Sequence, residues 1–273
     1  MKGPNPLHLK QSLESLVSQT YDSIEVIVIF DEEGKSLDAE NLSVFEQFRD
    51  DHRVKVFRRK AGRGLCSALN DAIKLCKGNF IARMDADDVS CPDRIEKQVY
   101  SIKKRRLSVI GTWAYLTNED CKVIGQLSHP TEPEDIRRVI MLHNPIVHGS
   151  ILFPRELIKE VGLFNSAFYG AEDYDFYLRC IAAGKQLGNL GEPLLYLRET
   201  KGSITRGKNM MQSRTNYFKT KINASFKYGF RTPLDLTYLC ISPFIFLIPP
   251  GKTKNVKSLL GWFSYNQQPV NYV

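Results

Sequence analysis

Apolar residues in the first third of the chain follow a helical period and a strand period in turn. Over residues 6–19 they recur every three or four positions, which predicts an amphipathic helix. Residues 24–30 are β-branched and almost wholly apolar, as in a parallel strand that is buried on both faces. Shorter apolar runs predict further strands at 54–57 and 80–84, with a helix between them that Gly78 ends.

The same alternation continues to about residue 200. We expect helices at 92–106, 133–141, 154–162 and 170–183, and strands at 108–116, 121–125, 151–153, 187–190 and 194–197. The first of these helices is expected to begin at Pro92, with Ser90 and Asp93 as a capping pair. Strands that alternate with helices in this way are typical of a doubly wound α/β fold. The sequence therefore predicts a Rossmann-like, mostly parallel sheet flanked by helices, in a domain over residues 1–200.

The pattern changes in residues 201–273. Residues 208–228 are basic and mostly polar, and residues 234–248 are strongly apolar but interrupted by Pro243. This apolar run is too short and too broken to span a bilayer as one helix. Two interpretations stay open: an interfacial segment that contacts anionic lipid, or a helix that packs on the preceding domain. Both predict a helical C-terminal extension.

Composition and charge narrow the class of protein. The chain of 273 residues has a net charge of +8 and six cysteines, none of them in a C-x-x-C pair. Scattered cysteines suggest neither a zinc site nor a disulfide framework, which favours a reducing, cytoplasmic location. The first six residues lack the apolar core of a secretory signal. The basic run that follows Arg198 suits an anionic partner, but no recognisable nucleic-acid-binding module accompanies it.

Three acids, Asp85, Asp87 and Asp88, follow directly after the strand predicted at 80–84. Ligands of open α/β sheets bind at the carboxyl ends of the strands. Three neighbouring carboxylates need a counter-charge, and a hard divalent cation with oxygen ligands, Mg²⁺ or Mn²⁺, is the natural one. The alternative is that the acids only favour the positive end of the next helix. We interpret the loop as a metal site for a diphosphate.

Four further positions carry candidate chemistry, each with a structural alternative. Asp31 ends a strand and could accept a hydrogen bond from a nucleotide base, or serve only the turn. Arg63 stands between two glycines and could reach a phosphate, or be a solvated loop residue. Glu172 and Asp173 open a helix; they could include a general base, or only complement the helix dipole. His148 could contact phosphate or substrate, or be structural.

Several stretches, taken together, resemble the family 2 glycosyltransferases with the GT-A fold. The resemblance is closest to bacterial enzymes of capsule, exopolysaccharide and lipopolysaccharide synthesis, and it covers about residues 7–200. The stretches that carry it are Leu13–Tyr21, Gly62–Asn70, Ala82–Asp88, Pro92–Arg94, Asn144–Pro145, His148 and Ala171–Asp175.

The resemblance implies a role for each candidate residue. Asp85 and Asp87 would bind the metal and the nucleotide sugar, with Asp88 as a possible alternative ligand. Asp173 would be the catalytic base, and Asp31 would contact the uracil. The implied reaction is an inverting transfer from a UDP-sugar to a saccharide acceptor. We expect this acceptor to be lipid-linked and the enzyme to lie at the cytoplasmic face of the membrane. Donor contact by Arg63 and acceptor or phosphate contact by Glu172 and His148 complete the expected site.

The sequence departs from the family pattern in two places. Family members carry an apolar strand, ending near P-x-Y-N, before the first helix, whereas here Met1 stands immediately before that helix. We therefore expect one wall of the nucleotide pocket to be lacking. At Arg198 to Thr200, where many relatives have a histidine that completes the metal shell, no such ligand is present.

Two other functions compete with this interpretation. A non-catalytic remnant would retain the fold without binding a donor, and the expected loss of a strand favours it. A sugar-nucleotide pyrophosphorylase also binds Mg²⁺ on a related sheet, but its glycine-rich signature with arginine and lysine is absent near the start.

Overall fold

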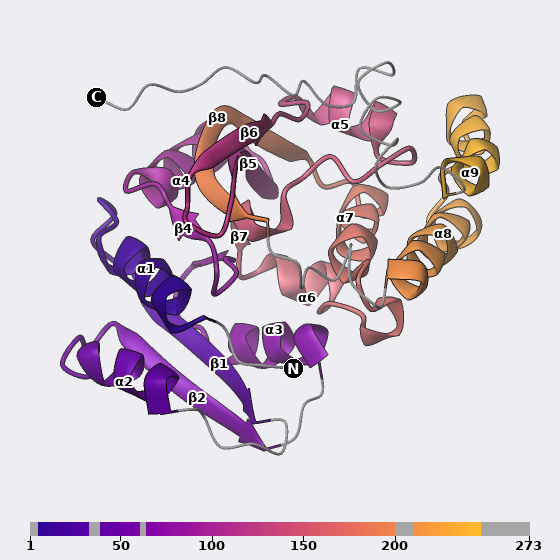
Figure 1. The fold of residues 1–273 in the computed structure, drawn as a ribbon. Helices are drawn as coiled ribbons and strands as arrows, with labels where there is room; N and C mark the ends of the chain where they lie inside the picture. Colours follow the sequence, from indigo (N-terminus) through magenta and orange to yellow (C-terminus); the bar gives the residue numbers. More distant parts are fainter. Residues whose placement is uncertain (1–4, 33–38, 61–63, 200–209, 247–273) are drawn as a thin grey trace.

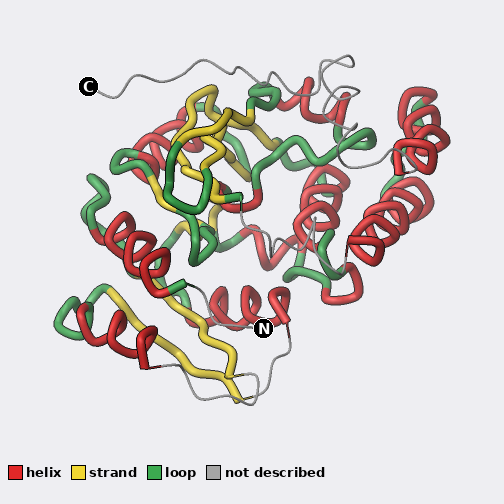
Figure 2. Tube along the Cα trace, in the orientation of Figure 1, coloured by secondary structure: helices red, strands yellow, loops and turns green. Residues whose placement is uncertain are grey.

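The strands of the protein form two separate groups with helices packed around them (Figure 1, Figure 2). The structure is a computed structural model that describes residues 5–32, 39–60, 64–199 and 210–246. One group is a parallel pair, and the other is a mixed sheet of six strands. The α/β class expected from the sequence is confirmed.

The parallel pair comes from the first apolar runs of the chain. Its elements are α1 (Pro6–Val17), β1 (Val26–Glu32), α2 (Ala39–Gln47) and β2 (Val54–Lys60). The two strands pair along their whole length, from Val26 opposite Val54 onward. Leu9 and Leu13 of the first helix pack against Val26 and Val44, so this unit has a small core of its own.

The larger sheet has the order β3-β7-β5-β8-β4, and β6 pairs with β5. These strands are β3 (Phe80–Ala82), β4 (Val89–Ser90), β5 (Val109–Thr117), β6 (Val123–Leu127), β7 (Leu152–Pro154) and β8 (Leu187–Arg198). Only β5 and β8 are parallel in this sheet, and the other pairs are antiparallel. The two parallel pairs, β1 with β2 and β5 with β8, nevertheless contain the most paired residues. Parallel pairing therefore predominates, as expected, and shorter antiparallel pairs add strands to the larger sheet.

Helices cover the sheet and contribute most of the main core. They are α3 (Gly64–Leu75), α4 (Arg94–Lys104), α5 (Pro133–Val139), α6 (Leu157–Val161) and α7 (Glu172–Ala182), with short 3₁₀ turns at His148–Ser150 and Ser166–Phe168. Helix α4 buries Ile95, Val99 and Ile102 on one face, as its helical period predicts. Helix α7 is buried along most of its length and places Tyr174 and Phe176 in the main core.

Two local predictions are wrong. Helix α4 begins at Arg94 rather than at Pro92, because Ser90 belongs to β4 and is not part of a cap. Asp93 makes no side-chain cap bond and instead forms an ion pair with Lys97. The two short extended pieces expected after residue 187 are one continuous strand, β8, whose long parallel register with β5 carries it past Pro193.

The described part of the C-terminal extension, residues 210–246, folds as two helices, α8 (Met210–Lys227) and α9 (Pro233–Phe246). Helix α8 lies beside α7 (Figure 1), and Ala224 and Phe230 join the main core. The carboxylate of Asp235 accepts two hydrogen bonds of 2.8 Å from Arg137, which attaches α9 to α5. Within the described ranges, no helix has the length and hydrophobicity needed to cross a membrane.

Candidate active site

The acidic loop begins where β3 ends, and its first acid, Asp85, forms an ion pair with the buried Arg83. Arg83 donates from its backbone N–H to the carbonyl of Ile151 at 2.9 Å, which continues the contact of β3 with β7. Its guanidinium then turns back and forms a two-bond ion pair with the carboxylate of Asp85. The arginine side chain is 8% exposed and that of Asp85 is 36% exposed, so the pair lies at the edge between core and solvent.

The other two acids of the loop meet the end of β8. Arg198 donates from its backbone N–H to Oδ1 of Asp88 at 2.9 Å and from its guanidinium to the carbonyl of Asp87 at 2.7 Å. Burial and the charge of Asp85 raise the pKa of Asp87. Burial raises the pKa of Asp88 well above its usual range, and the charge of Asp85 adds to the effect. The loop thus holds more negative charge than its own contacts neutralise.

Polar side chains of α1, and of the turn after it, form hydrogen bonds with the acidic loop and β4. The hydroxyl of Ser12 donates to the carbonyl of Asp85, and the hydroxyl of Ser15 accepts from the backbone N–H of Ser90 at 3.0 Å. The amide of Gln19 donates to the Ser90 hydroxyl and to a carbonyl at Cys91, and it accepts from the start of α4. The first helix therefore joins the parallel pair to the acidic loop.

The second pair of acids opens α7. Asp173 is 7% exposed, and burial together with the charge of Glu172 raises the pKa of Asp173 to about 7. Its Oδ2 atom accepts a hydrogen bond of 2.7 Å from the side-chain amide of Asn144. Burial also raises the pKa of Glu172, whose Oε2 atom has no hydrogen-bond partner among the described residues. A carboxyl with a pKa near neutral is suited to act as a general base.

The turn at His148 and Gly149 lies beside the acidic loop. A Cβ atom on Gly149 would lie 3.0 Å from Oδ2 of Asp88 and 3.3 Å from the Arg83 guanidinium, so a larger residue here would require these side chains to shift by a few tenths of an ångström. Burial and the nearby charge of Arg83 lower the pKa of His148 well below its usual range, which makes this histidine neutral. Arg94 holds the turn in place through a bond of 3.0 Å from its guanidinium to the Gly149 carbonyl.

Arg83 connects the candidate residues into one site. Its positive charge acts on the acidic loop at Asp87 and Asp88, and also on His148 and on the Glu172–Asp173 pair. Residues that are far apart in the sequence are therefore electrostatic neighbours around a single buried guanidinium. The sequence analysis assigned no role to Arg83, Arg94 or Asn144, although each stands inside a stretch that carries the family resemblance.

The three acids of the loop do not form a three-carboxylate metal site. In the part of the chain that the structure describes, no group of three or more His, Cys, Asp or Glu side chains is arranged to hold a metal ion. The reason is that Asp88 is directed to β8 and Asp85 to Arg83. The donor set still fits Mg²⁺ or Mn²⁺ bound to a diphosphate, since such ions take one or two protein carboxylates and fill their shell with phosphate and water. The raised pKa of Asp87 supports this fit, because a bound cation would stabilise the charged form of this buried carboxyl.

Two predicted donor residues, Asp31 and Arg63, lie at the limits of the described structure. Asp31 lies in β1, opposite Arg59 of β2, and its side chain is outside the described part of the structure. Arg63 lies outside the described residues altogether. Their donor contacts stay predictions.

With this geometry established, sequence comparison identifies the class of protein. The profile of the Glycosyl transferase family 2 matches residues 6–162, so the chain belongs to that family. It is 33% identical to the O-antigen biosynthesis glycosyltransferase WbnJ of Escherichia coli over 189 residues, which cover 68% of this chain and 72% of the relative. It is 27% identical to the amylovoran biosynthesis glycosyltransferase AmsE of Erwinia amylovora, with coverage of 80% and 81%.

Solved structures confirm the GT-A-like fold. The S. aureus TarS fragment 1–349 in complex with UDP-GlcNAc matches with a TM-score of 0.63 and 16% identity, over 93% of this chain and 76% of the fragment. The mannosyltransferase PcManGT of Pyrobaculum calidifontis, in complex with GDP-Man and Mn²⁺, matches with a TM-score of 0.58 and 17% identity, over 96% and 78% of the two chains. The protein is thus a family 2 glycosyltransferase with a GT-A-like fold.

Proposed function

We propose that this protein is an inverting, metal-dependent glycosyltransferase that moves a sugar from a UDP-sugar to a lipid-linked saccharide in surface polysaccharide synthesis. The observation that carries the proposal is the placement of the acidic loop and of Asp173 around Arg83. The printed functions of the relatives WbnJ and AmsE support a polysaccharide acceptor. The TarS complexes with UDP and UDP-GlcNAc support a UDP-sugar donor.

In this proposal Asp173 takes the proton of an acceptor hydroxyl. The hydroxyl oxygen forms a bond to the anomeric carbon of the donor sugar, and the bond from that carbon to the diphosphate oxygen breaks. The electron pair of the broken bond leaves with UDP, and the configuration at the anomeric carbon inverts. Asn144 orients the carboxylate through its bond to Oδ2, so that Oδ1 is left for the acceptor. The pKa of about 7 lets Asp173 accept a proton near neutral pH.

The donor side of the proposed site consists of Asp85 and Asp87. Mg²⁺ or Mn²⁺ bound there with the diphosphate would offset the negative charge that develops on the leaving group. Arg83 holds Asp85 in a fixed orientation. Burial and the charge of Asp85 raise the pKa of Asp87, and a bound cation would stabilise its charged form. Asp88 has a structural position, between the end of β8 and Gly149.

The proposed roles can be separated by two variants. Asp87→Asn should abolish metal-dependent binding of the UDP-sugar, because the donor diphosphate loses its bridge to the protein. Asp173→Asn should leave donor binding intact and lower the single-turnover rate by about 10²- to 10⁴-fold, the usual contribution of a general base. Near-normal transfer by Asp173→Asn would contradict the assignment of the base. Titration calorimetry and single-turnover assays give the two quantities.

We further propose that α9 contacts the cytoplasmic face of the membrane that carries the acceptor. Its side chains Leu234, Leu236, Ile241 and Phe244 are exposed, although they are large and apolar. Exposed apolar residues on one helix suit insertion into the headgroup region. Asp235, by contrast, is buried and bonded to Arg137, which fixes the helix to the catalytic domain.

A matched pair of variants tests the membrane contact. Leu236→Glu should reduce co-sedimentation with liposomes of anionic lipid several-fold, because it places a charge on the apolar surface of α9. Thr237→Glu introduces the same charge at the next, also exposed, position and should have a smaller effect. Equal binding by both variants and the native protein would contradict membrane contact through α9.

A further inference from the structure

Helix α8 directs a buried polar face toward the catalytic domain. Four of its polar side chains are at most 6% exposed: Ser213, Asn216, Thr220 and Lys221. They occupy positions i, i+3, i+7 and i+8, which lie on one side of a helix. Because buried polar groups need hydrogen-bond partners, the partners of this face show which segments the helix holds in place.

Ser213 and Asn216 bind the turn before α7. The hydroxyl of Ser213 donates to the carbonyl of Gly170 at 2.8 Å. The amide of Asn216 donates to the carbonyl of Tyr169 at 2.9 Å. Helix α7 begins two residues after Gly170, and Asp173 is its second residue. Helix α8, which lies beside α7 (Figure 1), therefore fixes the backbone from which the proposed base extends.

Lys221 binds a second segment of the site. Its Nζ atom donates to the carbonyl of Leu142 at 2.9 Å and to the hydroxyl of Ser242 in α9 at 2.6 Å. Leu142 stands two residues before Asn144, whose amide donates to Oδ2 of Asp173. Burial lowers the pKa of Lys221 to about 7, and no carboxylate among the described residues offsets this effect. Because an amine buried without partners is costly, both bonds matter, and they join Leu142 to α8 and α9.

Tyr217 of α8 lies against both members of the Asn144–Asp173 pair. Burial raises the pKa of Tyr217 well above its usual range, the charge of Asp173 adds to this effect, and a hydrogen bond with the Asn144 side chain opposes it. The ring of Tyr217 stacks on that of Tyr174, with 5.0 Å between the centroids. Tyr174 donates from its hydroxyl to the carbonyl of Ile140. Contacts from α7 and α8 thus hold the chain on both sides of Leu142.

We propose that Lys221 is a positioning residue for sugar transfer. Through its bonds to α9 and to the Leu142 carbonyl, it keeps the amide of Asn144 on the carboxylate of Asp173. Both helices of the described C-terminal extension then contribute to catalysis, although the family profile ends at residue 162. The inference rests on the proposed function, which assigns Asp173 as the base. Since an amide N–H stabilises an ionised carboxylate, a displaced Asn144 would raise the pKa of Asp173.

The titratable groups around Asp173 come from α7, from α8 and from the end of β3: Glu172, Tyr174, Tyr177, Tyr217 and Arg83. The charge of Glu172 raises the pKa of Asp173, and that of Arg83 lowers it. Burial raises the pKa values of the three tyrosines well above their usual range, so they stay uncharged at neutral pH. The variants below leave all five groups in place, so a changed pKa of Asp173 reports its bond to Asn144.

Titration of the Asp173 carboxyl tests the proposal on the full chain. Carbon NMR of aspartate-labelled protein gives its pKa, with Asp173→Asn to assign the signal, and single-turnover transfer gives the kinetic midpoint. Lys221→Met removes the donor but keeps a chain of similar length. It should raise both values by about one pH unit, as expected for loss of one hydrogen bond to a charged group, and leave donor binding unchanged. Lys219→Met, the same substitution at an exposed position of α8, should raise neither value.

A double-mutant cycle shows whether Lys221 acts through Asn144. Asn144→Ala should raise the pKa of Asp173 by itself. Lys221→Met should then add little to this rise, because the bond that it supports is already lost. Additive shifts, or a pKa of Asp173 that Lys221→Met leaves unchanged, would overturn the proposal.

Ser242→Ala keeps the test decisive if circular dichroism shows that Lys221→Met does not fold. It removes the α9 partner of Lys221 and should raise the pKa of Asp173 by a smaller amount; an unchanged pKa would overturn the proposal. If the native protein transfers sugar and Asp173→Asn does not, while Lys221→Met equals the native protein in both values, this inference alone fails. If the native protein transfers no sugar, the proposed function fails and the inference fails with it.

Discussion

At the residue scale, the site depends on burial of charged groups around one arginine. Arg83 is 8% exposed, and the carboxyls of Asp88 and Asp173 near it are 1% and 7% exposed. Burial penalises the charged form of each carboxyl, and the arginine only partly offsets this penalty. In the proposed mechanism these acids have different tasks: Asp88 holds the end of β8, and Asp173 is the acid that titrates during transfer.

The pH dependence of transfer follows from this electrostatic environment. Because Asp173 must be ionised to accept a proton and its pKa lies at about 7, the single-turnover rate should rise as the pH increases through 7 and then level off. The charge of Glu172 contributes to the raised pKa. Glu172→Gln should therefore move the midpoint of the profile to lower pH. A midpoint that stays in place or moves upward would contradict the coupling between the two acids.

The same residues show what the sequence could predict at this scale. Asp85 and Asp87 could be proposed as site residues because acids after a strand have a known chemistry, and Asp173 because of the family resemblance. Arg83 and Arg94 could not, since an arginine in the sequence is usually solvent-exposed and nothing local indicates that these two are buried. The bond from Asn144 to Asp173 joins positions 29 residues apart, and no local pattern encodes it.

At the scale of elements, the first helix has a function beyond its apolar face. Leu9 and Leu13 gave α1 its predicted period, and they pack against β1 and α2 as expected. The polar residues Ser12 and Ser15 of α1, and Gln19 in the turn after it, bind the acidic loop and β4. Periodicity reveals which face of a helix is buried in the core, but it does not reveal which backbone groups the polar face will meet.

Removal of the Gln19 side chain tests this role of α1. Its amide is buried and makes four hydrogen bonds, to Ser15, Ser90, Cys91 and Ile95. Gln19→Ala should lower the free energy of unfolding by about 2–3 kcal/mol, because the partner groups stay buried without a bond. Gln47→Ala, at an exposed position with one weak bond, should change it by less than about 0.5 kcal/mol. Urea titration measures both values, and equal effects would contradict the role of α1.

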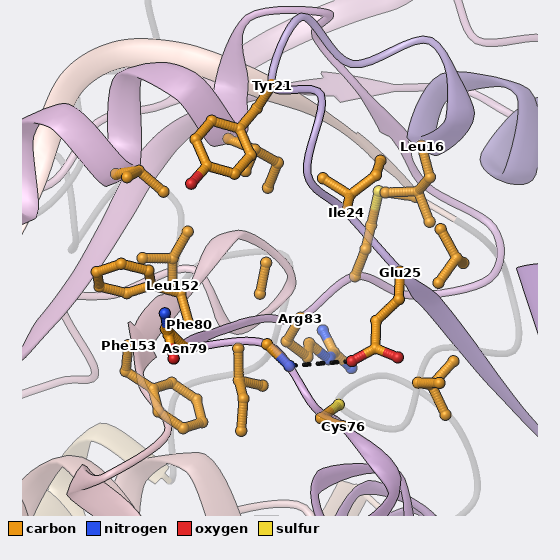
Figure 3. A pocket seen from close by; sticks show the side chains of 18 of the residues that line it. Leu16, Tyr21, Ile24, Glu25, Cys76, Asn79, Phe80, Arg83, Leu152 and Phe153 are labelled. Atoms are coloured by element: carbon orange, nitrogen blue, oxygen red, sulfur yellow. Dashed lines mark hydrogen bonds between the residues drawn. The ribbon is translucent and has the colours of Figure 1, made fainter. Parts of the chain in front are cut away.

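At the scale of the whole molecule, the order of the strands in the sheet could not be predicted from the sequence. The apolar runs located every strand except the two-residue β4, but β8 pairs with β5 and β4 across long sequence separations. Among the described residues, the parallel pair bonds to no strand of the larger sheet, and a cavity lies between the two (Figure 3). Fold class and catalytic region thus follow from periodicity and motifs, whereas the pairing follows from long-range packing.

The most direct test of the central claim is the thermal midpoint of the protein with UDP and Mn²⁺, together and separately. The account predicts a rise of about 5 °C with both ligands at about 100 times their dissociation constant, and little change with either alone. Asp87→Asn should fold normally and lose the rise. A cooperatively folded protein whose midpoint does not respond to the two ligands together would contradict a UDP-sugar site and favour a non-catalytic protein.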